Sequence, residues 1–205
     1  MKTRIISAVL IASMAFAAAA CDSKLPEAEV TTLQSFEQDT QYTAEDLDFN
    51  VLIPGGWSLE RLENMEDGSD IFADHGNYTD AIILFKTKPD GSVSGYGPML
   101  EAIYFADSDS QTIYNSLKKN GVNIVPCDNI TVNGKDCLVC YSQTAEENSS
   151  PDVEPYTQTH VIIPVTDTSC FHVVIDCGGD VSETAEFGIN DSDALKFMES
   201  LSPKK

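Results

Sequence analysis

The sequence predicts an α+β domain built on a central, mostly antiparallel β-sheet that is flanked by helices. Three observations support this fold class: short strand-like runs separated by turn residues, several runs that are apolar on both faces, and two segments with helical periodicity. Short turns between successive strands favour antiparallel pairing, and strands that are apolar on both faces must be covered on both sides. Helices are the expected cover.

Residues 1–20 have the layout of a secretory signal peptide. They comprise a basic start with Lys2 and Arg4, an apolar segment over residues 5–16 and a run of alanines. The apolar segment is shorter than the roughly 20 residues that a membrane-spanning helix needs. We therefore expect the rest of the chain to be exported.

The signal layout ends at Cys21, which directly follows Ala-Ala-Ala-Ala. This arrangement resembles the lipobox of bacterial lipoproteins, although Ala18 stands where the lipobox favours Leu. The resemblance implies cleavage before Cys21, a lipid on its thiol and attachment to the cell membrane on the extracytoplasmic side; two acyl chains suffice for stable anchoring. The alternative is cleavage by the ordinary signal peptidase, with Cys21 free or in a disulfide.

The expected mature chain is strongly acidic. Residues 1–20 hold two of the 12 basic residues and none of the 33 acidic ones, so 10 basic residues remain against 33 acidic ones, a net charge of −23. Such a surface repels nucleic acid and anionic lipid headgroups. We expect the membrane to be reached through the lipid anchor, and the partner to be a protein or small molecule rather than nucleic acid.

Composition divides the mature chain into two parts. Residues 21–46 are polar and acidic without sustained periodicity, which predicts a flexible, dispensable tether behind the lipid anchor. The alternative is that Leu33 and Phe36 dock on the domain, so that part of this segment is ordered. Residues 47–205 match the length of one globular domain. The strand candidates in this domain are residues 49–53, 57–59, 71–73, 81–86, 99–105, 122–125, 129–132, 136–142, 156–165 and 171–177.

Two helices are predicted from periodicity and end signals. The first has Ser108 or Asp109 as its N-cap and ends at Gly121. The second begins near residues 191–192 and stops before Pro203.

Four short motifs of the domain resemble the PsbP-like superfamily. They are the segment FNVLIPGGW near the domain start, a middle strand and helix, the hairpin segment ITVNG over 130–134 and the final helix ALKFMESL over 194–201. The resemblance implies an α/β/α sandwich, with an antiparallel sheet between helices, and proteins that act by binding without shared catalytic residues.

No recognisable catalytic motif is present in the sequence, and no cofactor or metal site is predicted. His75, His160 and His172 lie far apart and lack ligand spacing, so we expect them on the surface or on edge strands. Cys137 and Cys140 form a Cys-x-x-Cys motif inside a strand-like run, where positions three apart point to opposite faces. We therefore expect neither a redox nor a metal role for this motif.

Asn133-Gly134 favours a two-residue type I′ hairpin turn, which predicts a disulfide between Cys127 and Cys140. A regular hairpin about this turn places the two cysteines opposite each other in a non-hydrogen-bonded pair, where side chains lie closest. The alternatives are that Pro126 ends the strand or forces a bulge, or that the cysteines are small buried apolar residues.

Taken together, these features predict a lipid-anchored, extracytoplasmic binding or accessory domain of bacteria that is not an enzyme. The alternative is an extracytoplasmic enzyme or thiol redox factor whose site is not visible in the sequence. Coupled titratable groups in one pocket, or two cysteines at a helix N-terminus, would favour the alternative.

Overall fold

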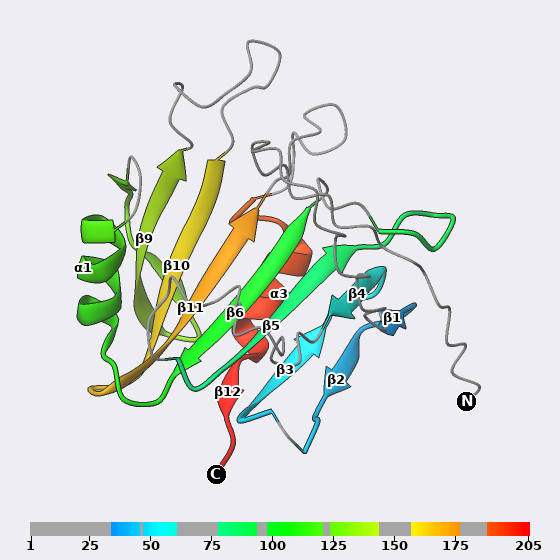
Figure 1. Ribbon diagram of the computed structural model, residues 1–205, viewed down its shortest axis with the longest axis horizontal. Helices are drawn as coiled ribbons and strands as arrows, with labels where there is room; N and C mark the ends of the chain where they lie inside the picture. Colours follow the sequence, from blue (N-terminus) through cyan, green and yellow to red (C-terminus); the bar gives the residue numbers. More distant parts are fainter. Residues whose placement is uncertain are drawn as a thin grey trace, which may run out of the picture.

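The computed structural model describes residues 34–45, 47–60, 78–93, 98–120, 124–143, 157–176 and 188–205. Its main element is a nine-stranded antiparallel sheet (Figure 1), in which the strand order is β1-β4-β5-β6-β11-β10-β9-β7 and β8 also pairs with β9. The strands in this order are β1 (Gln34–Phe36), β4 (Trp57–Glu60), β5 (Asp80–Lys86), β6 (Met99–Phe105), β11 (Ser169–Asp176), β10 (Thr157–Thr166), β9 (Lys135–Gln143) and β7 (Val125–Pro126), with β8 at Ile130–Val132.

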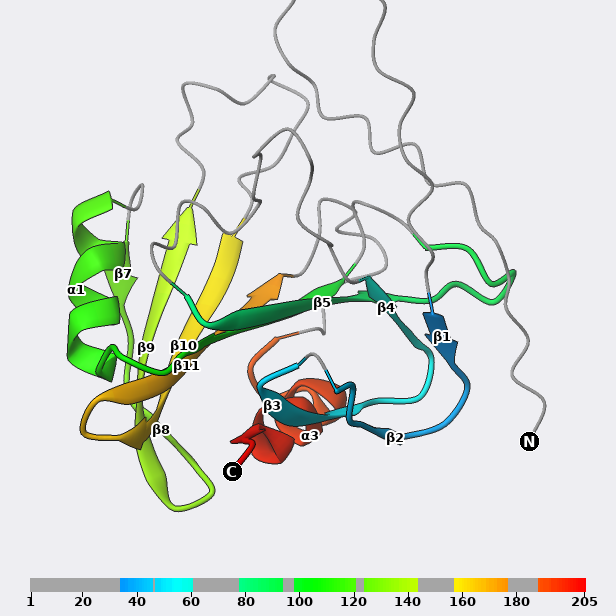
Figure 2. The same cartoon turned by 60° about the horizontal axis from the view of Figure 1, so that its bottom comes forward.

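A second, three-stranded sheet and two helices complete the described part of the chain. The small sheet has the order β12 (Ser202–Pro203), β3 (Phe49–Ile53) and β2 (Thr40–Tyr42). The helices are α1 (Ser110–Asn120) and α3 (Ser192–Ser200). Figure 2 shows β2, β3 and α3 together on one side of the large sheet, with α1 at the end near β7 and β9.

The predicted fold class is wrong in its helical part. Strands hold 52% of the described residues and helices hold 16%, so the protein is not a PsbP-like α/β/α sandwich whose helices cover both faces of the sheet. Each helix is short, with 11 residues in α1 and nine in α3. Strand β3 helps to cover the large sheet in place of a helix, because Phe49, Val51 and Ile53 point to one side and pack into the main core.

Several local predictions are confirmed. Residues 49–53 and 57–60 are strands separated by a turn in which Gly56 adopts φ +81°, a conformation that favours glycine. All eight residues of β11 are buried, as expected for a strand that is covered on both faces. Asp109 and Asp191 cap the two helices through hydrogen bonds to the amides of Thr112 and Asp193.

Two groups of apolar side chains pack against the two faces of the large sheet. The main core includes Trp57, Phe171 and Phe197, so it joins β4 and β11 to α3. A smaller cluster includes Phe105 and Ile113 and packs α1 on the other face. Alternating residues of the same strands supply the two clusters, as the period of two along a strand requires.

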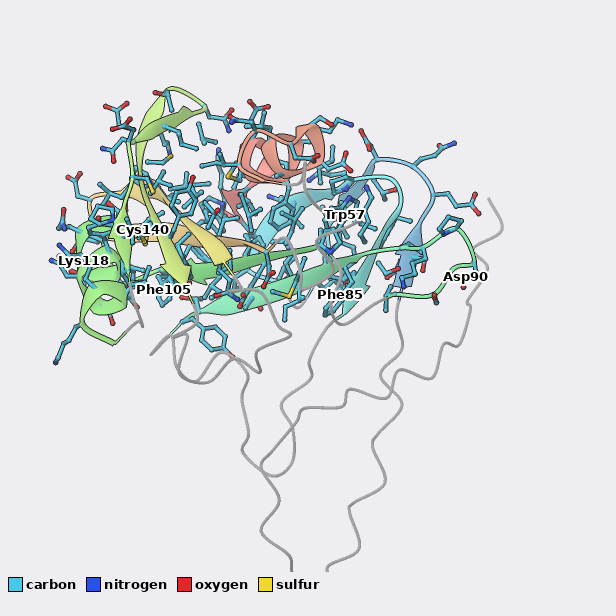
Figure 3. All side chains as sticks on the ribbon, turned by 90° about the horizontal axis from the view of Figure 1, so that it is seen from above. Trp57, Phe85, Asp90, Phe105, Lys118 and Cys140 are labelled. Carbon is cyan, nitrogen blue, oxygen red and sulfur yellow. The ribbon has the colours of Figure 1, made fainter. Side chains whose placement is uncertain are left out.

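Helix α3 is joined to the sheet by a polar contact as well as by its apolar face. The indole nitrogen of Trp57 donates to Asp193 Oδ2 over 3.0 Å, and Lys86 Nζ lies 2.7 Å from the same oxygen. The Lys86 ammonium also lies 4.9 Å from the centre of the Trp57 ring. In Figure 3, Trp57 lies on the side of the sheet that carries α3.

The folded part of the chain begins before residue 47. Strand β1 pairs with β4, and Phe36 is buried in the main core. Strand β2 pairs with β3, so residues 34–45 contribute to both sheets. The rest of the predicted tether, residues 21–33 and 46, lies outside the described residues, as does the signal layout over 1–20. Neither described helix is long and apolar enough to span a membrane.

Candidate functional site

Six polar side chains gather on one face of four neighbouring strands of the large sheet. We call this set the polar cluster. Alternation along each strand directs them to the face that carries α1, and the strand registers bring them together. Its members are Glu101 on β6, Ser142 on β9, Gln158 and His160 on β10, and His172 and Asp176 on β11.

A chain of hydrogen bonds runs diagonally across three strands of the polar cluster. Ser142 Oγ lies 2.8 Å from His160 Nε2, and His160 Nδ1 lies 3.0 Å from His172 Nε2. The two imidazole rings are stacked, with centroids 5.2 Å apart. His160 is 5% exposed and His172 is 1% exposed, whereas Ser142 is partly exposed near the end of β9.

This geometry constrains the protons of the two histidines. A hydrogen bond between His160 Nδ1 and His172 Nε2 needs one nitrogen with a hydrogen and one without. When both rings are neutral, two tautomer arrangements satisfy the chain. In one of them Ser142 donates to His160, and in the other His160 donates to Ser142. If both rings were protonated to imidazolium, both facing nitrogens would carry a hydrogen and the bond between the rings would be lost.

The carboxyl groups of the polar cluster come from β6 and β11. Glu101 is 7% exposed. Its pKa is raised to about 8, mainly by burial and to a smaller extent by repulsion from the nearby Asp176 carboxylate. The side-chain amide of Gln158 donates to Asp176 Oδ2 over 3.1 Å. Glu101 therefore holds a proton at neutral pH and is able to take part in proton exchange near physiological pH.

The expectation that the histidines are surface or edge-strand residues is wrong for two of them. His160 and His172 are buried on β10 and β11, which are interior strands of the large sheet. His75 lies outside the described residues. Sequence separation hid the contact, because the β10–β11 hairpin brings together residues that are 12 positions apart.

The predicted disulfide residues lie near each other but are not bonded. Cys127 and Cys140 are both free thiols, and Pro126 rather than Cys127 faces Cys140. The predicted turn is present, with φ of 51° at Asn133 and 75° at Gly134, and Ile130 faces Cys137 as expected. The ladder then shifts by one residue, because the segment between β7 and β8 contains one residue more than the facing part of β9.

The described thiols have raised pKa values. Burial raises the pKa of Cys140 to about 11 and that of Cys170 to about 12. Burial also raises the pKa of Cys127 and Cys137. Cys137 packs into the main core and Cys140 lies on the opposite face, so the Cys-x-x-Cys thiols point apart. Cys21 and Cys177 lie outside the described residues.

Within the described ranges, no group of three or more His, Cys, Asp or Glu side chains has a geometry that could hold a metal ion. The two histidines of the polar cluster contact each other through nitrogen atoms that a metal would require, so their arrangement fits a hydrogen-bonded pair.

Comparisons with known proteins give distant structural neighbours. No family model matches the sequence, and no curated protein matches it. A crystal structure from Bacteroides thetaiotaomicron is 14% identical with a TM-score of 0.47, covering 83% of this chain and 50% of the other, so this chain spans half the length of that protein. LpqN, involved in cell envelope biogenesis of Mycobacterium tuberculosis, is 16% identical with a TM-score of 0.43, covering 81% of this chain and 91% of LpqN. Both neighbours are bacterial proteins, and neither similarity assigns an activity to this chain.

Proposed function

We propose that this chain is a lipid-anchored protein on the extracytoplasmic side of a bacterial membrane, where its domain binds another molecule. The observation that carries the location is the signal layout that ends at Cys21. Residues 22–33 join this anchor to β1, which begins at Gln34. A flexible linker of about 12 residues would span on the order of 20 Å and keep the domain close to the membrane.

The charge of the protein favours a partner that is neutral or basic. The mature chain would carry 33 acidic and 10 basic residues, a balance that repels anionic lipid headgroups and nucleic acid. The lipid would then hold the domain at the membrane without drawing its surface onto the headgroups. A basic protein surface or a neutral small molecule meets no such repulsion.

The partly exposed rim of the polar cluster, Ser142 and Gln158, is the site that we assign to binding. Ser142 and Gln158 are partly exposed, and they lie where β9 ends and β10 begins. Their hydroxyl and amide groups offer both donors and acceptors to a ligand. A thiol redox role has less support, because thiols with a raised pKa provide little of the thiolate that redox chemistry requires.

Two measurements test this function separately. In a bacterial host, wild-type protein should partition into detergent and Cys21→Ser should remain aqueous, and aqueous partitioning of both would contradict lipid anchoring. For binding, a photo-crosslinking amino acid at position 158 should capture a membrane-fraction partner that the same amino acid at the exposed position 38 does not capture. Equal capture at both positions would place the binding site elsewhere.

A further inference from the structure

Ser142, His160 and His172 form a hydrogen-bonded chain in the order of nucleophile, base and orienting group. The two links measure 2.8 Å and 3.0 Å. A nucleophile within hydrogen-bond reach of a base that a third group orients is the geometric signature of activated serine residues on unrelated folds. We propose that these three residues form a hydrolytic triad that cleaves carboxylic esters, an activity beyond the binding role proposed above.

Each residue has a distinct role in this triad. Ser142 is the nucleophile, because it carries the hydroxyl of the hydrogen-bonded chain and is a partly exposed residue, one position before the end of β9. His160 is the general base, with Nε2 directed at Oγ. His172 is a positioning residue: in the tautomer arrangement that the triad uses, its Nε2 accepts a hydrogen from Nδ1 of His160, which leaves the other nitrogen of His160 able to accept the proton of Ser142.

Burial of the two histidines suits this arrangement. Both rings are at least 95% buried on neighbouring strands of one hairpin, so the sheet holds them in position before a substrate binds. The bond between the rings is buried, while Ser142 is a partly exposed residue. The result is a preorganised base next to a partly exposed nucleophile.

The reaction uses only the ester and water. Ser142 Oγ forms a bond to the acyl carbon as its proton moves to His160 Nε2, and the alcohol leaves with that proton when the ester C–O bond breaks. A water molecule then gives a proton to His160 Nε2 and adds its oxygen to the acyl carbon. Cleavage of the bond to Ser142 releases the carboxylic acid, and Oγ recovers its proton from His160.

The charge around the triad selects the class of ester. The Asp176 carboxylate lies on the same face of the sheet, and the chain as a whole has a net charge of −21. An anionic substrate would be repelled, whereas a neutral or cationic ester would not. We therefore assign neutral and cationic esters to this site.

This inference departs from the expectation of a non-enzymatic domain. That expectation depended on the absence of a recognisable catalytic motif and on histidines that are far apart in the sequence. The triad needs no local motif, because its three members come from three different strands. Catalytic triads are defined by geometry and roles rather than by sequence position.

The test combines a neutral fluorophosphonate probe, which labels activated serine residues, with hydrolysis of p-nitrophenyl acetate. Wild-type protein should be labelled at Ser142, as located by peptide mass mapping, and Ser142→Ala should lose both labelling and hydrolysis. Ser35→Ala is the matched control, because Ser35 is also a strand serine but contacts a hydroxyl group, Ser58, instead of a histidine. His160→Gln should label at least about 100-fold more slowly, the lower range of a general base contribution.

His172 is tested by two variants of different hydrogen-bonding capacity. His172→Gln places an amide oxygen near the position of Nε2 and should retain part of the labelling rate, whereas His172→Leu has no acceptor and should lose it. A circular dichroism melt identifies variants that fail to fold. Folded wild-type protein without label at Ser142, undiminished hydrolysis by Ser142→Ala, or equal labelling of wild type and folded His160→Gln would each overturn the proposal.

Discussion

Replacing Glu101 with glutamine should stabilise the protein at neutral and alkaline pH and leave its stability near pH 4 almost unchanged. Glu101 is 7% exposed, and burial together with the Asp176 carboxylate raises its pKa from 4.5 to about 8. Glutamine has nearly the shape of a protonated glutamic acid and does not ionise. The variant therefore removes the cost of a buried negative charge while it preserves the packing.

The sign and magnitude follow from proton linkage. The folded state keeps the Glu101 proton up to about pH 8, whereas the unfolded chain releases it near pH 4.5. The contribution of Glu101 to the stability of the wild type is therefore greatest below pH 4.5 and falls as pH rises toward 8. At about 1.4 kcal/mol per pKa unit, the loss is about 3 kcal/mol at pH 7 and about 5 kcal/mol above pH 8. These figures are of the order that Glu101→Gln should recover.

Urea unfolding followed by tryptophan fluorescence measures this effect between pH 4 and pH 9. The chain has one tryptophan, Trp57, and it is fully buried, so its emission reports directly on unfolding. Glu37→Gln is the matched control because Glu37 is exposed. A difference between Glu101→Gln and wild type that stays constant from pH 4 to pH 9 would refute the coupling of Glu101 ionisation to folding.

Two further predictions concern the contacts that attach helix α3, and strands β1 and β2, to the rest of the fold. Asp193→Ala should lower the free energy of unfolding by about 2–3 kcal/mol, because it removes the acceptor for Trp57 and the ion-pair partner of Lys86, whereas Asp193→Asn keeps an acceptor oxygen and should lose less. Urea unfolding distinguishes the two, and equal losses would show that the indole bond adds nothing. A chain that starts at Ala44 should melt at a lower temperature than one that starts at Gln34, because it lacks β1, β2 and the buried Phe36. Identical midpoints would support the dispensable tether predicted from composition.

The local elements were readable from the sequence because their causes are local. Asp109 and Asp191 lie just before helical periodicity, and their short carboxylates cap the exposed amides of the first turn. Asn133 and Gly134 tolerate the positive φ that a tight hairpin needs. Such features depend on a few neighbouring residues, so neither the rest of the chain nor the sheet order is needed to predict them.

The layers of the fold were not readable in the same way. An apolar strand that is covered on both faces looks the same in the sequence whether a helix or another strand covers it. Here β3 covers part of the large sheet through Phe49, Val51 and Ile53, and α3 covers another part. The prediction assigned this role to helices alone, because nothing in the apolar pattern of a strand identifies the element that packs against it.

By itself, the sequence predicted the signal layout that ends at Cys21, the strong negative charge, most of the described strands, the start of each helix to within one residue and the turn at Asn133-Gly134. Which distant side chains meet depends on the tertiary structure. Two irregularities in strand pairing illustrate this. An extra residue between β7 and β8 moves Cys127 out of register with Cys140. A register shift between Pro164 and Thr166 places His160 and His172 on the same face, where a regular two-residue hairpin would have placed them on opposite faces. A shift of one residue reverses the face of every side chain beyond it, so the geometry of the polar cluster exists only in the folded sheet.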